Sequence, residues 1–280
     1  MKNFAYVNAP TVDAALEALA AHDNALIVAG GTDVMIGILA RNINDKTIVD
    51  IHAIDDLKEI VDNGDTITLG ALVTLKQIEH SDLIEKDAKC LWQAAQVFAD
   101  PTTRNSATVG GNLGKASPAG DTLPSLLALD AVLTVEKKGG KREISINDYF
   151  KGPGKTCLEA GEMITHVTIK KSQNCCFIKL GLRKAMAISV ASVAVAFEKS
   201  ECGCSAKNVH VAMGSVAATP VRCKKAEAAI ENGGEDLTAA LEAALADDIH
   251  PIDDFRATGR YRSMVAPGLV ERAYKNACGC

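Results

Sequence analysis

Residues 108–122, "TVGGNLGKASPAGDT", form a glycine-rich stretch with a Gly-Lys pair, a composition typical of loops that bind phosphate. A nucleotide-hydrolysing P-loop has a Ser or Thr after its Gly-Lys pair and an earlier glycine at a fixed distance. Here Gly114-Lys115 is followed by Ala116, and Val109 occupies the place of the earlier glycine. The glycines also miss the dinucleotide pattern Gly-x-Gly-x-x-Gly by one position. The stretch therefore argues against nucleotide hydrolysis and leaves its ligand open.

A second glycine pair occurs in "AGGTD", residues 29–33, well before "TVGGN", residues 108–112. Glycine allows the backbone to approach a bulky ligand and to present N–H groups to a diphosphate. Two such turns could hold one long dinucleotide from two sides. Either pair by itself is better explained as an ordinary tight turn.

The composition limits the class of protein. The 280 residues carry a net charge of −5, and 48% of them are hydrophobic, which is enough for one large or two smaller cores. The net charge is negative and the sequence contains no block of five or more basic residues, so nothing indicates nucleic acid binding. No apolar run is long enough for a bilayer, and the N-terminus lacks the pattern of a signal peptide. We expect a cytoplasmic protein that binds neither nucleic acid nor membrane.

Nine cysteines are many for such a protein, and they include Cys175-Cys176 and the pairs Cys202-Gly-Cys204 and Cys278-Gly-Cys280. Their spacing fits neither a zinc knuckle nor a plant-type iron–sulfur site. No two histidines have metal-ligand spacing, and no Gly-x-Ser-x-Gly nucleophile motif is present. We therefore predict free thiols and no metal site.

The first half of the chain alternates helical and strand-like patterns. Helical spacing covers residues 11–23, 33–41, 83–100 and 122–131, and strand-like segments cover 24–31, 47–51 and 65–73. The helix over 83–100 has the strongest pattern and is expected to end at Pro101. A hairpin over 131–146 should turn at Gly139 and Gly140.

The boundary to the second half lies within the polar segment "KKSQN", residues 170–174. Three strand patterns are followed by three helical patterns, at residues 175–183, 188–200 and 208–216 and at 222–232, 237–248 and 258–277. Strands followed by helices are typical of a separate α+β unit. We therefore divide the chain into residues 1–172 and 173–280.

The stretch over residues 99–131 resembles, over its full length, the FAD-binding subunit of the molybdenum hydroxylases, the medium-subunit family of xanthine dehydrogenase and carbon monoxide dehydrogenase. The family motifs match Ala29 to Asp33, Arg104-Asn105, Thr108 to Asn112 and Ala116 to Asp121. The likeness continues in "VAMGSVAATPVR" and "DDFRATGRYRSMVAPGLVERA". It implies an α+β fold, with a two-subdomain FAD-binding domain of the PCMH type before a C-terminal domain of a three-stranded sheet plus helices.

The resemblance also implies which residues bind FAD. The first diphosphate loop would consist of Ile27, Val28, Ala29, Gly30, Gly31, Thr32, Asp33 and Val34. The second contact set would be Phe98, Thr108, Gly111, Asn112, Ser117 and Asp121, with Ile164 and Lys179 near the isoalloxazine ring. A side chain at Gly111 would displace the diphosphate, and a positive φ would be a second reason for glycine there. Asp121 could instead cap the following helix, and Lys179 could be a solvated strand residue.

By the same resemblance, the chain is an electron-transfer subunit with no catalytic side chain of its own. Electrons would pass between [2Fe-2S] clusters on a partner and an acceptor such as NAD, while a third subunit carries molybdopterin. The alternatives are a stand-alone FAD oxidoreductase with its own substrate site, and a scaffold that has lost the flavin. The segment "KLGLRKAMAISVASVAVAF" is most similar to purine and nicotinate members of the family, and the region around 179–187 is expected to dock the iron–sulfur partner.

Overall fold

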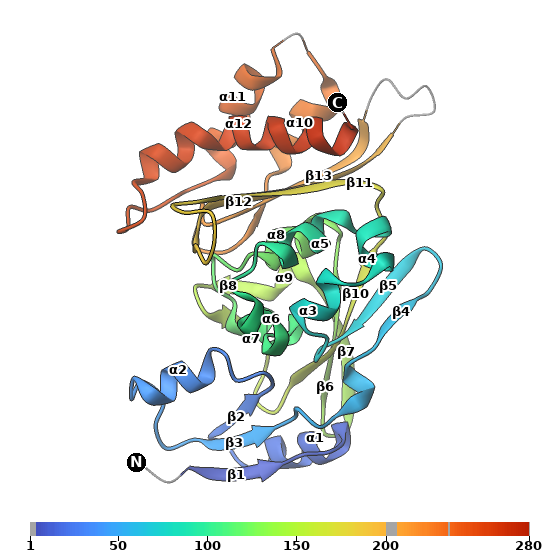
Figure 1. The fold of residues 1–280 in the computed structure, drawn as a ribbon, viewed down its shortest axis with the longest axis vertical. Coiled ribbons are helices and arrows are strands. Elements are labelled where there is room, and N and C mark those ends of the chain that lie inside the picture. The colour runs from blue at the N-terminus through green and yellow to red at the C-terminus, as the bar shows by residue number, and fades with distance from the viewer. Residues whose placement is uncertain (1–3, 200–205, 235, 280) are drawn as a thin grey trace.

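The computed structural model describes residues 4–199, 206–234 and 236–279, which form three stacked parts (Figure 1). The lowest part in Figure 1 is a parallel sheet of order β1-β3-β2, with strands Ala5–Asn8, Thr47–Asp50 and Ala25–Val28. Helix α1 (Val12–Ala21) buries Leu16 and Leu19, and the Thr11 side chain caps its first turn. Helix α2 (Val34–Leu39) contains no buried residue.

The middle part is an antiparallel sheet of order β4-β5-β10-β6-β7. Its strands are Ile60–Asp62, Thr66–Gly70, Met163–Lys170, Val132–Lys137 and Gly140–Ser145. The predicted hairpin is confirmed, with Gly139 at a φ of +80° in its turn. The elements around the sheet are η1 (Asp55–Leu57), α3 (Leu75–Glu79), α4 (Asp82–Asp87), α5 (Lys89–Gln96), α6 (Pro101–Ser106), α7 (Val109–Lys115), α8 (Thr122–Ala128), α9 (Ile146–Tyr149), β8 (Phe150–Gly152) and β9 (Lys155–Thr156).

The upper part is an antiparallel sheet of order β11-β12-β13-β14, with strands Asn174–Gly181, Ser189–Lys199, Ala206–Gly214 and Val221–Arg222. Helices α10 (Lys224–Asn232), α11 (Leu237–Asp248) and α12 (Gly259–Cys278) follow, as the sequence predicted. The α+β class is confirmed, but the prediction of three strands is wrong. The fourth strand has only two residues, which is too short to produce an alternating pattern.

The prediction of one helix over 83–100 is also wrong. The chain breaks at Ala88 (φ −150°), between α4 and α5, where it pairs with Ser172 of the linker to the upper part. The Ser172 N–H donates to the Asp87 carbonyl oxygen at 2.7 Å. Pro101 does not end a helix but begins α6. It stands in the first turn, where a backbone N–H has no partner within the helix, so the missing N–H of proline costs nothing.

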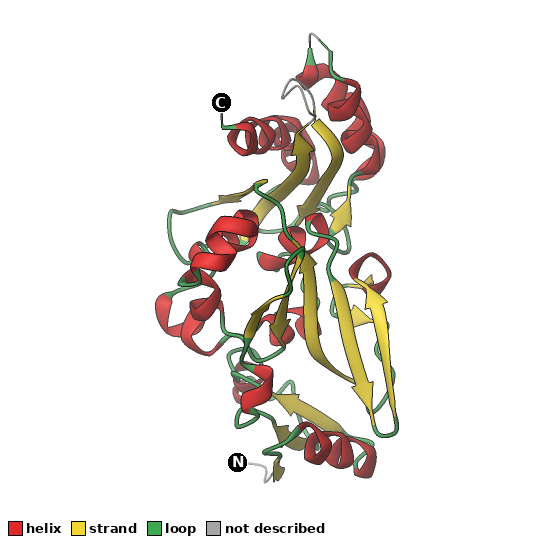
Figure 2. Ribbon diagram, turned by 90° about the vertical axis from the view of Figure 1, so that its right-hand side faces the viewer, coloured by secondary structure: helices red, strands yellow, loops and turns green. Residues whose placement is uncertain are grey.

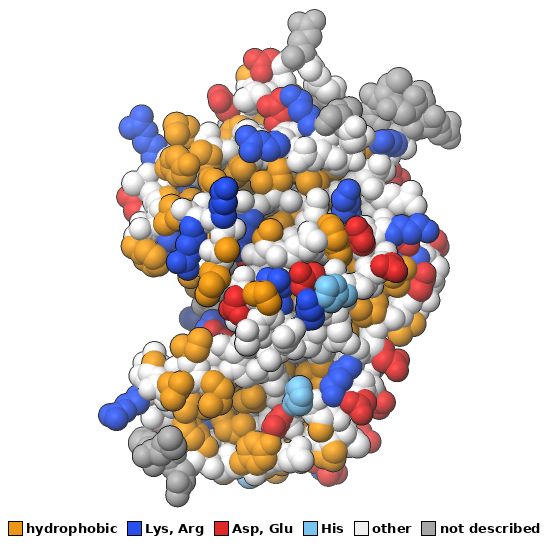
Figure 3. Space-filling view, viewed as in Figure 1, with side chains coloured by type: hydrophobic (Ala, Val, Ile, Leu, Met, Phe, Trp, Pro, Cys, Tyr) orange, Lys and Arg blue, Asp and Glu red, His pale blue; other side chains and the backbone are white. Residues whose placement is uncertain are grey.

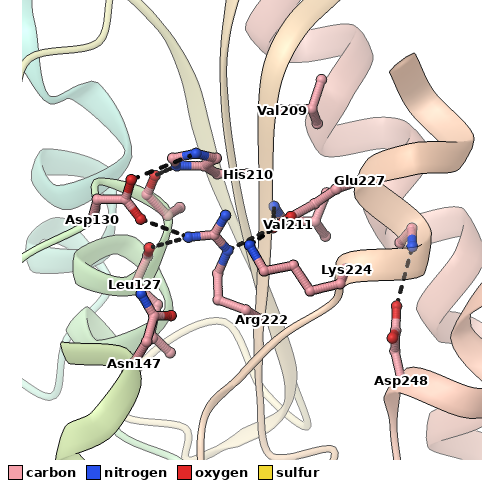
Figure 4. A network of polar contacts seen from close by, with 12 residues as sticks. Leu127, Asp130, Asn147, Val209, His210, Val211, Arg222, Lys224, Glu227 and Asp248 are labelled. Atoms are coloured by element: carbon pink, nitrogen blue, oxygen red, sulfur yellow. Dashed lines mark hydrogen bonds and ion pairs between the residues drawn. The ribbon is translucent and has the colours of Figure 1, made fainter. Parts of the chain in front are cut away.

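The upper sheet packs on the middle part through one of its faces (Figure 2). Alternate residues of β11 and β12, such as Phe177 and Ala194, belong to the same core as α5 and α8, whereas Val193 and Val195 face α12. A polar network crosses the same boundary (Figure 4). The Arg222 guanidinium donates to Asp130 at 2.8 Å and to the Leu127 carbonyl oxygen at 3.2 Å, and it pairs with Glu227. The two units are therefore packed together by buried contacts.

In the part of the chain that the structure describes, no helix is both long and apolar enough to cross a membrane.

Candidate functional site

The first glycine pair, in the lower part, lies against the end of α6, just before the second glycine stretch of the middle part. A Cβ atom on Gly30 would be 1.6 Å from the backbone carbonyl oxygen of Ser106. Only glycine allows this approach, because any side chain would overlap the backbone of Ser106 and Ala107. Next to this contact, Lys115 Nζ lies 2.7 Å from Asp33 Oδ2 and links the end of α7 to the start of α2.

The first loop presents polar backbone groups that the protein itself does not use. Gly31 has a φ of +69°, which turns the chain from β2 toward α2. Among the described residues, no acceptor is in hydrogen-bonding position for the N–H groups of Gly31, Thr32 and Asp33. Successive free N–H groups in a turn of this kind form a concave site for an anion. The other residues predicted in this set, Ile27, Val28 and Ala29, are partly buried, and Val34 begins α2.

The second loop is not a loop over its whole length, because residues 109–115 form α7. Thr108 caps this helix, and its Oγ1 accepts from the Gly111 N–H at 3.0 Å. A positive φ is therefore not the reason for Gly111, which is helical and exposed. A Cβ there would lie 2.9 Å from Thr108 Oγ1 and would disturb the cap. Asn112 Oδ1 accepts a hydrogen bond from the Thr122 hydroxyl at 2.7 Å. This bond links the Asn112 side chain on α7 to the start of α8.

Asp121, Lys179 and Ser189 form a buried polar cluster between the middle and upper parts. Asp121 Oδ2 accepts from the Lys179 ammonium at 2.6 Å, and Asp121 Oδ1 accepts from the Ser189 hydroxyl at 2.6 Å. The Lys179 ammonium also donates to the Val97 carbonyl oxygen at 3.1 Å. Burial raises the pKa of the Asp121 carboxyl, and Lys179 and Ser189 oppose this rise.

This cluster excludes the simpler roles considered for two residues. Asp121 precedes α8 but makes no side-chain capping bond, because its oxygens are directed to Lys179 and Ser189. The Lys179 side chain is only 8% exposed, so it is not a solvated strand residue. Ser189 was not identified from the sequence. No spacing signal could have found it, since it lies 68 residues from Asp121 in the chain.

The remaining predicted residues occupy different places. Phe98 is next to Val97 and is therefore close to Lys179, and Ser117 Oγ accepts from the Ala119 N–H in the turn before α8. Ile164 is 7% exposed on β10, the strand against which α7 packs. The structure thus brings most of the predicted residues to one side of the molecule, and it places Ile164 in the core behind α7.

Figure 3 shows that the surface is hollowed on this side, at the left, between the lower part and the rest. Helix α2 lies below the hollow, and the loop joining β11 and β12 lies above it (Figure 1). Both carry exposed apolar side chains: Met35, Ile36 and Leu39 on α2, and Leu182, Met186 and Ile188 on the loop. Ile188, at the end of the loop, is 56% exposed.

The residues present fit FAD. The free N–H groups of the 29–33 loop suit the diphosphate, and a Cβ on Gly114 would meet no atom within 4 Å, so open space lies beside α7. A carboxylate that accepts two bonds still has lone pairs for a cofactor hydroxyl, so Asp121 could accept another bond. No part of this arrangement requires a catalytic acid or base.

Within the described residues, no group of three or more His, Cys, Asp or Glu could hold a metal ion, and no disulfide is present. Cys202, Cys204 and Cys280 lie outside the described residues. We expect the chain purified alone under anaerobic conditions to contain negligible iron and acid-labile sulfide, because the cysteine spacing does not fit a plant-type iron–sulfur site. Stoichiometric amounts of both would contradict this prediction.

Comparisons with known proteins agree with the geometry. Residues 2–171 match the family model described as FAD binding domain in molybdopterin dehydrogenase, and residues 177–277 match the CO dehydrogenase flavoprotein C-terminal domain. The chain is 31% identical to the nicotinate dehydrogenase FAD-subunit of Eubacterium barkeri, over 98% of this chain and 96% of that protein. It is 30% identical to the xanthine dehydrogenase FAD-binding subunit of Escherichia coli O157:H7, over 97% and 95%.

Among solved structures, carbon monoxide dehydrogenase from Hydrogenophaga pseudoflava superimposes with a TM-score of 0.92 at 26% identity, covering 99% of this chain and 97% of that chain. The fold and the paired glycine loops define an FAD-binding oxidoreductase flavoprotein. The chain belongs to the FAD-binding medium subunits of the molybdenum hydroxylases, the xanthine dehydrogenase and carbon monoxide dehydrogenase type.

Proposed function

We propose that this chain relays electrons through one FAD between [2Fe-2S] clusters of a partner subunit and an external acceptor such as NAD. The observation that carries the proposal is the close approach of Gly30 to the Ser106 backbone, which places the first glycine loop and its free N–H groups against the segment that leads into the second glycine stretch. In this proposal, residues 1–172 hold the diphosphate, and residues 173–280 contribute Lys179 beside the flavin ring. When bound, a flavin can exchange two electrons together or one at a time, which suits a relay between a two-electron carrier such as NAD and one-electron [2Fe-2S] clusters.

The protein residues hold and orient the cofactor in this relay. The 29–34 loop and Asn112 bind the diphosphate, Asp121 accepts from a cofactor hydroxyl, and the Lys179 ammonium provides positive charge near the ring. The buried Asp121–Lys179 pair supports a functional role. Burial raises the pKa of the carboxyl even beside a lysine, so the pair contributes little net stability.

Substrate hydroxylation is assigned to a molybdopterin subunit of the same complex. We propose a purine or another N-heteroaromatic compound as the substrate, since the nicotinate and xanthine dehydrogenase subunits are among the similar proteins. The iron–sulfur subunit would dock at the β11–β12 loop. Its exposed Leu182 and Met186 lie beside Arg183 and Lys184, so an apolar surface rimmed with acidic groups would fit it.

The proposal is tested by reconstitution with and without the co-encoded partner subunits. Purines and pyridine carboxylates are assayed as substrates, and NAD, ferredoxin and quinone are assayed as acceptors. The isolated chain should bind FAD and exchange electrons with a soluble acceptor, but it should hydroxylate none of the substrates. Turnover by the isolated, molybdenum-free chain would favour a stand-alone flavin oxidoreductase, and absence of flavin would favour a scaffold.

A further inference from the structure

Ser189 occupies an unusual position in the upper sheet. The register of β11 with β12 pairs Lys179 with Ser192 and Leu180 with Ala191, but it then pairs Gly181 with Ser189. Val190 is therefore an extra residue, and the pairing shifts there in the manner of a β-bulge. Neighbouring residues of a strand point to opposite faces of the sheet, so one extra residue changes the face to which the side chains beyond it point.

In the regular part of β12, the even-numbered residues face the FAD-binding domain. Ala194 and Ala196 belong to the core shared with α5 and α8, whereas Val193 and Val195 pack on the other side. An odd-numbered residue would face away from Asp121 if the alternation continued. The extra Val190 instead turns Ser189 toward the same side as Ser192, where its hydroxyl reaches Asp121 at 2.6 Å.

The hydrogen bonds of the cluster hold both oxygens of the Asp121 carboxylate and the Lys179 ammonium in place. Ser189 holds one oxygen of the Asp121 carboxylate, and Lys179 holds the other. Lys179 also donates to the Val97 carbonyl oxygen, so its ammonium is fixed by two bonds and has a third N–H to donate. Within the described residues, Lys179 is the one charged side chain in contact with Asp121.

We propose that Ser189 is a positioning residue, which the bulge at Val190 directs at Asp121 so that the carboxylate cannot turn fully onto Lys179. The ammonium then keeps its position and its charge beside the flavin. This inference rests on the proposed FAD site, since it acts through Asp121 and Lys179. It assigns to the C-terminal domain a residue that adjusts the flavin without contacting it.

The test compares two buried serines of the same strand. Ser189→Ala removes the hydroxyl that holds Asp121, and Ser192→Ala removes one that has no hydrogen-bond partner among the described residues. Both serines are 0% exposed, so the two changes remove groups of equal size and burial. Ser189→Cys keeps the approximate shape of serine but is a weak donor, and it separates a lost hydrogen bond from a lost contact.

We expect Ser189→Ala to weaken FAD binding by the full-length chain about tenfold, because an Asp121 carboxylate drawn onto Lys179 loses one hydrogen bond with the cofactor hydroxyl. The midpoint potential of the bound flavin should become more negative, because the released carboxylate neutralises more of the Lys179 charge. Ser189→Cys should behave like Ser189→Ala, and Ser192→Ala should keep the affinity and potential of the wild type. Melting of the three apo variants monitors folding.

The outcomes separate the inference from the function on which it rests. If the wild-type chain binds no FAD, the proposed function fails and the inference fails with it. If the wild type binds FAD but Ser189→Ala and Ser192→Ala share its affinity and potential, only the inference is overturned. A lower melting temperature of Ser189→Ala with an unchanged potential would show a structural role and would also overturn it.

Discussion

Gly30→Ala is expected to yield a protein without FAD and to lower the free energy of unfolding of the apo chain by about 1–3 kcal/mol, the usual cost of overpacking. The added Cβ would lie 1.6 Å from the Ser106 carbonyl oxygen. The added Cβ is bonded to the backbone of Gly30 and the oxygen belongs to the backbone of Ser106, so neither can turn away. The two backbone segments must therefore move apart. Their separation removes the free N–H groups of residues 31–33 from their place opposite α7.

The measurement is the flavin released by acid precipitation, together with urea unfolding of the apo chain. Neither glycine loop contains a His or Cys that could bind flavin covalently, so acid should release all of it. The matched control is Gly268→Ala, since a Cβ at this position in α12 meets no atom within 4 Å. Alanine has a higher helix propensity than glycine, so this control should be more stable than the wild type by about 0.5–1 kcal/mol. It should keep the full flavin content. Wild-type flavin content in Gly30→Ala would refute the role given to the loop contact.

Asp121→Asn is expected to remove FAD and to lower the free energy of unfolding by about 3–5 kcal/mol, because it leaves the Lys179 ammonium buried without a counter-charge. Only 8% of each side chain in this pair is exposed. The double variant Asp121→Asn/Lys179→Met should regain much of the lost stability, since no uncompensated charge then remains. It should still bind no FAD, because the contacts proposed for Asp121 and Lys179 with the cofactor are both missing.

Chemical unfolding and FAD titration of Asp121→Asn, Lys179→Met and the double variant measure these effects as a cycle. Glu159→Ala is the control, because its 3.0 Å pair with Lys137 is largely exposed. Loss of such a pair should change stability by about 0–1 kcal/mol. If Asp121→Asn had an equally small effect, the pair would not be the buried charge cluster that we describe. If the double variant retained FAD, the roles proposed for Asp121 and Lys179 would be wrong.

The sequence by itself determined the class of fold and most of the local structure. Helical patterns of apolar residues predicted α1, α8 and the last three helices, because the residues that form each helix are close together in the chain. The glycine pairs and the motifs around them also indicated an FAD-binding subunit. Such signals are readable because they depend on residues close together in the chain.

The tertiary structure decided what depends on distant residues. The break at Ala88 follows from contact with Ser172, and the two-residue strand β14 exists only because β13 lies beside it. Gly111 was predicted to be part of a loop, but buried Val109 and Leu113 hold it in a helix. The contacts of Gly30 with Ser106, and of Asp121 with Lys179 and Ser189, join segments 58 or more residues apart. Local propensity carries no information about such pairs, because their partners meet only when the sheets and helices pack.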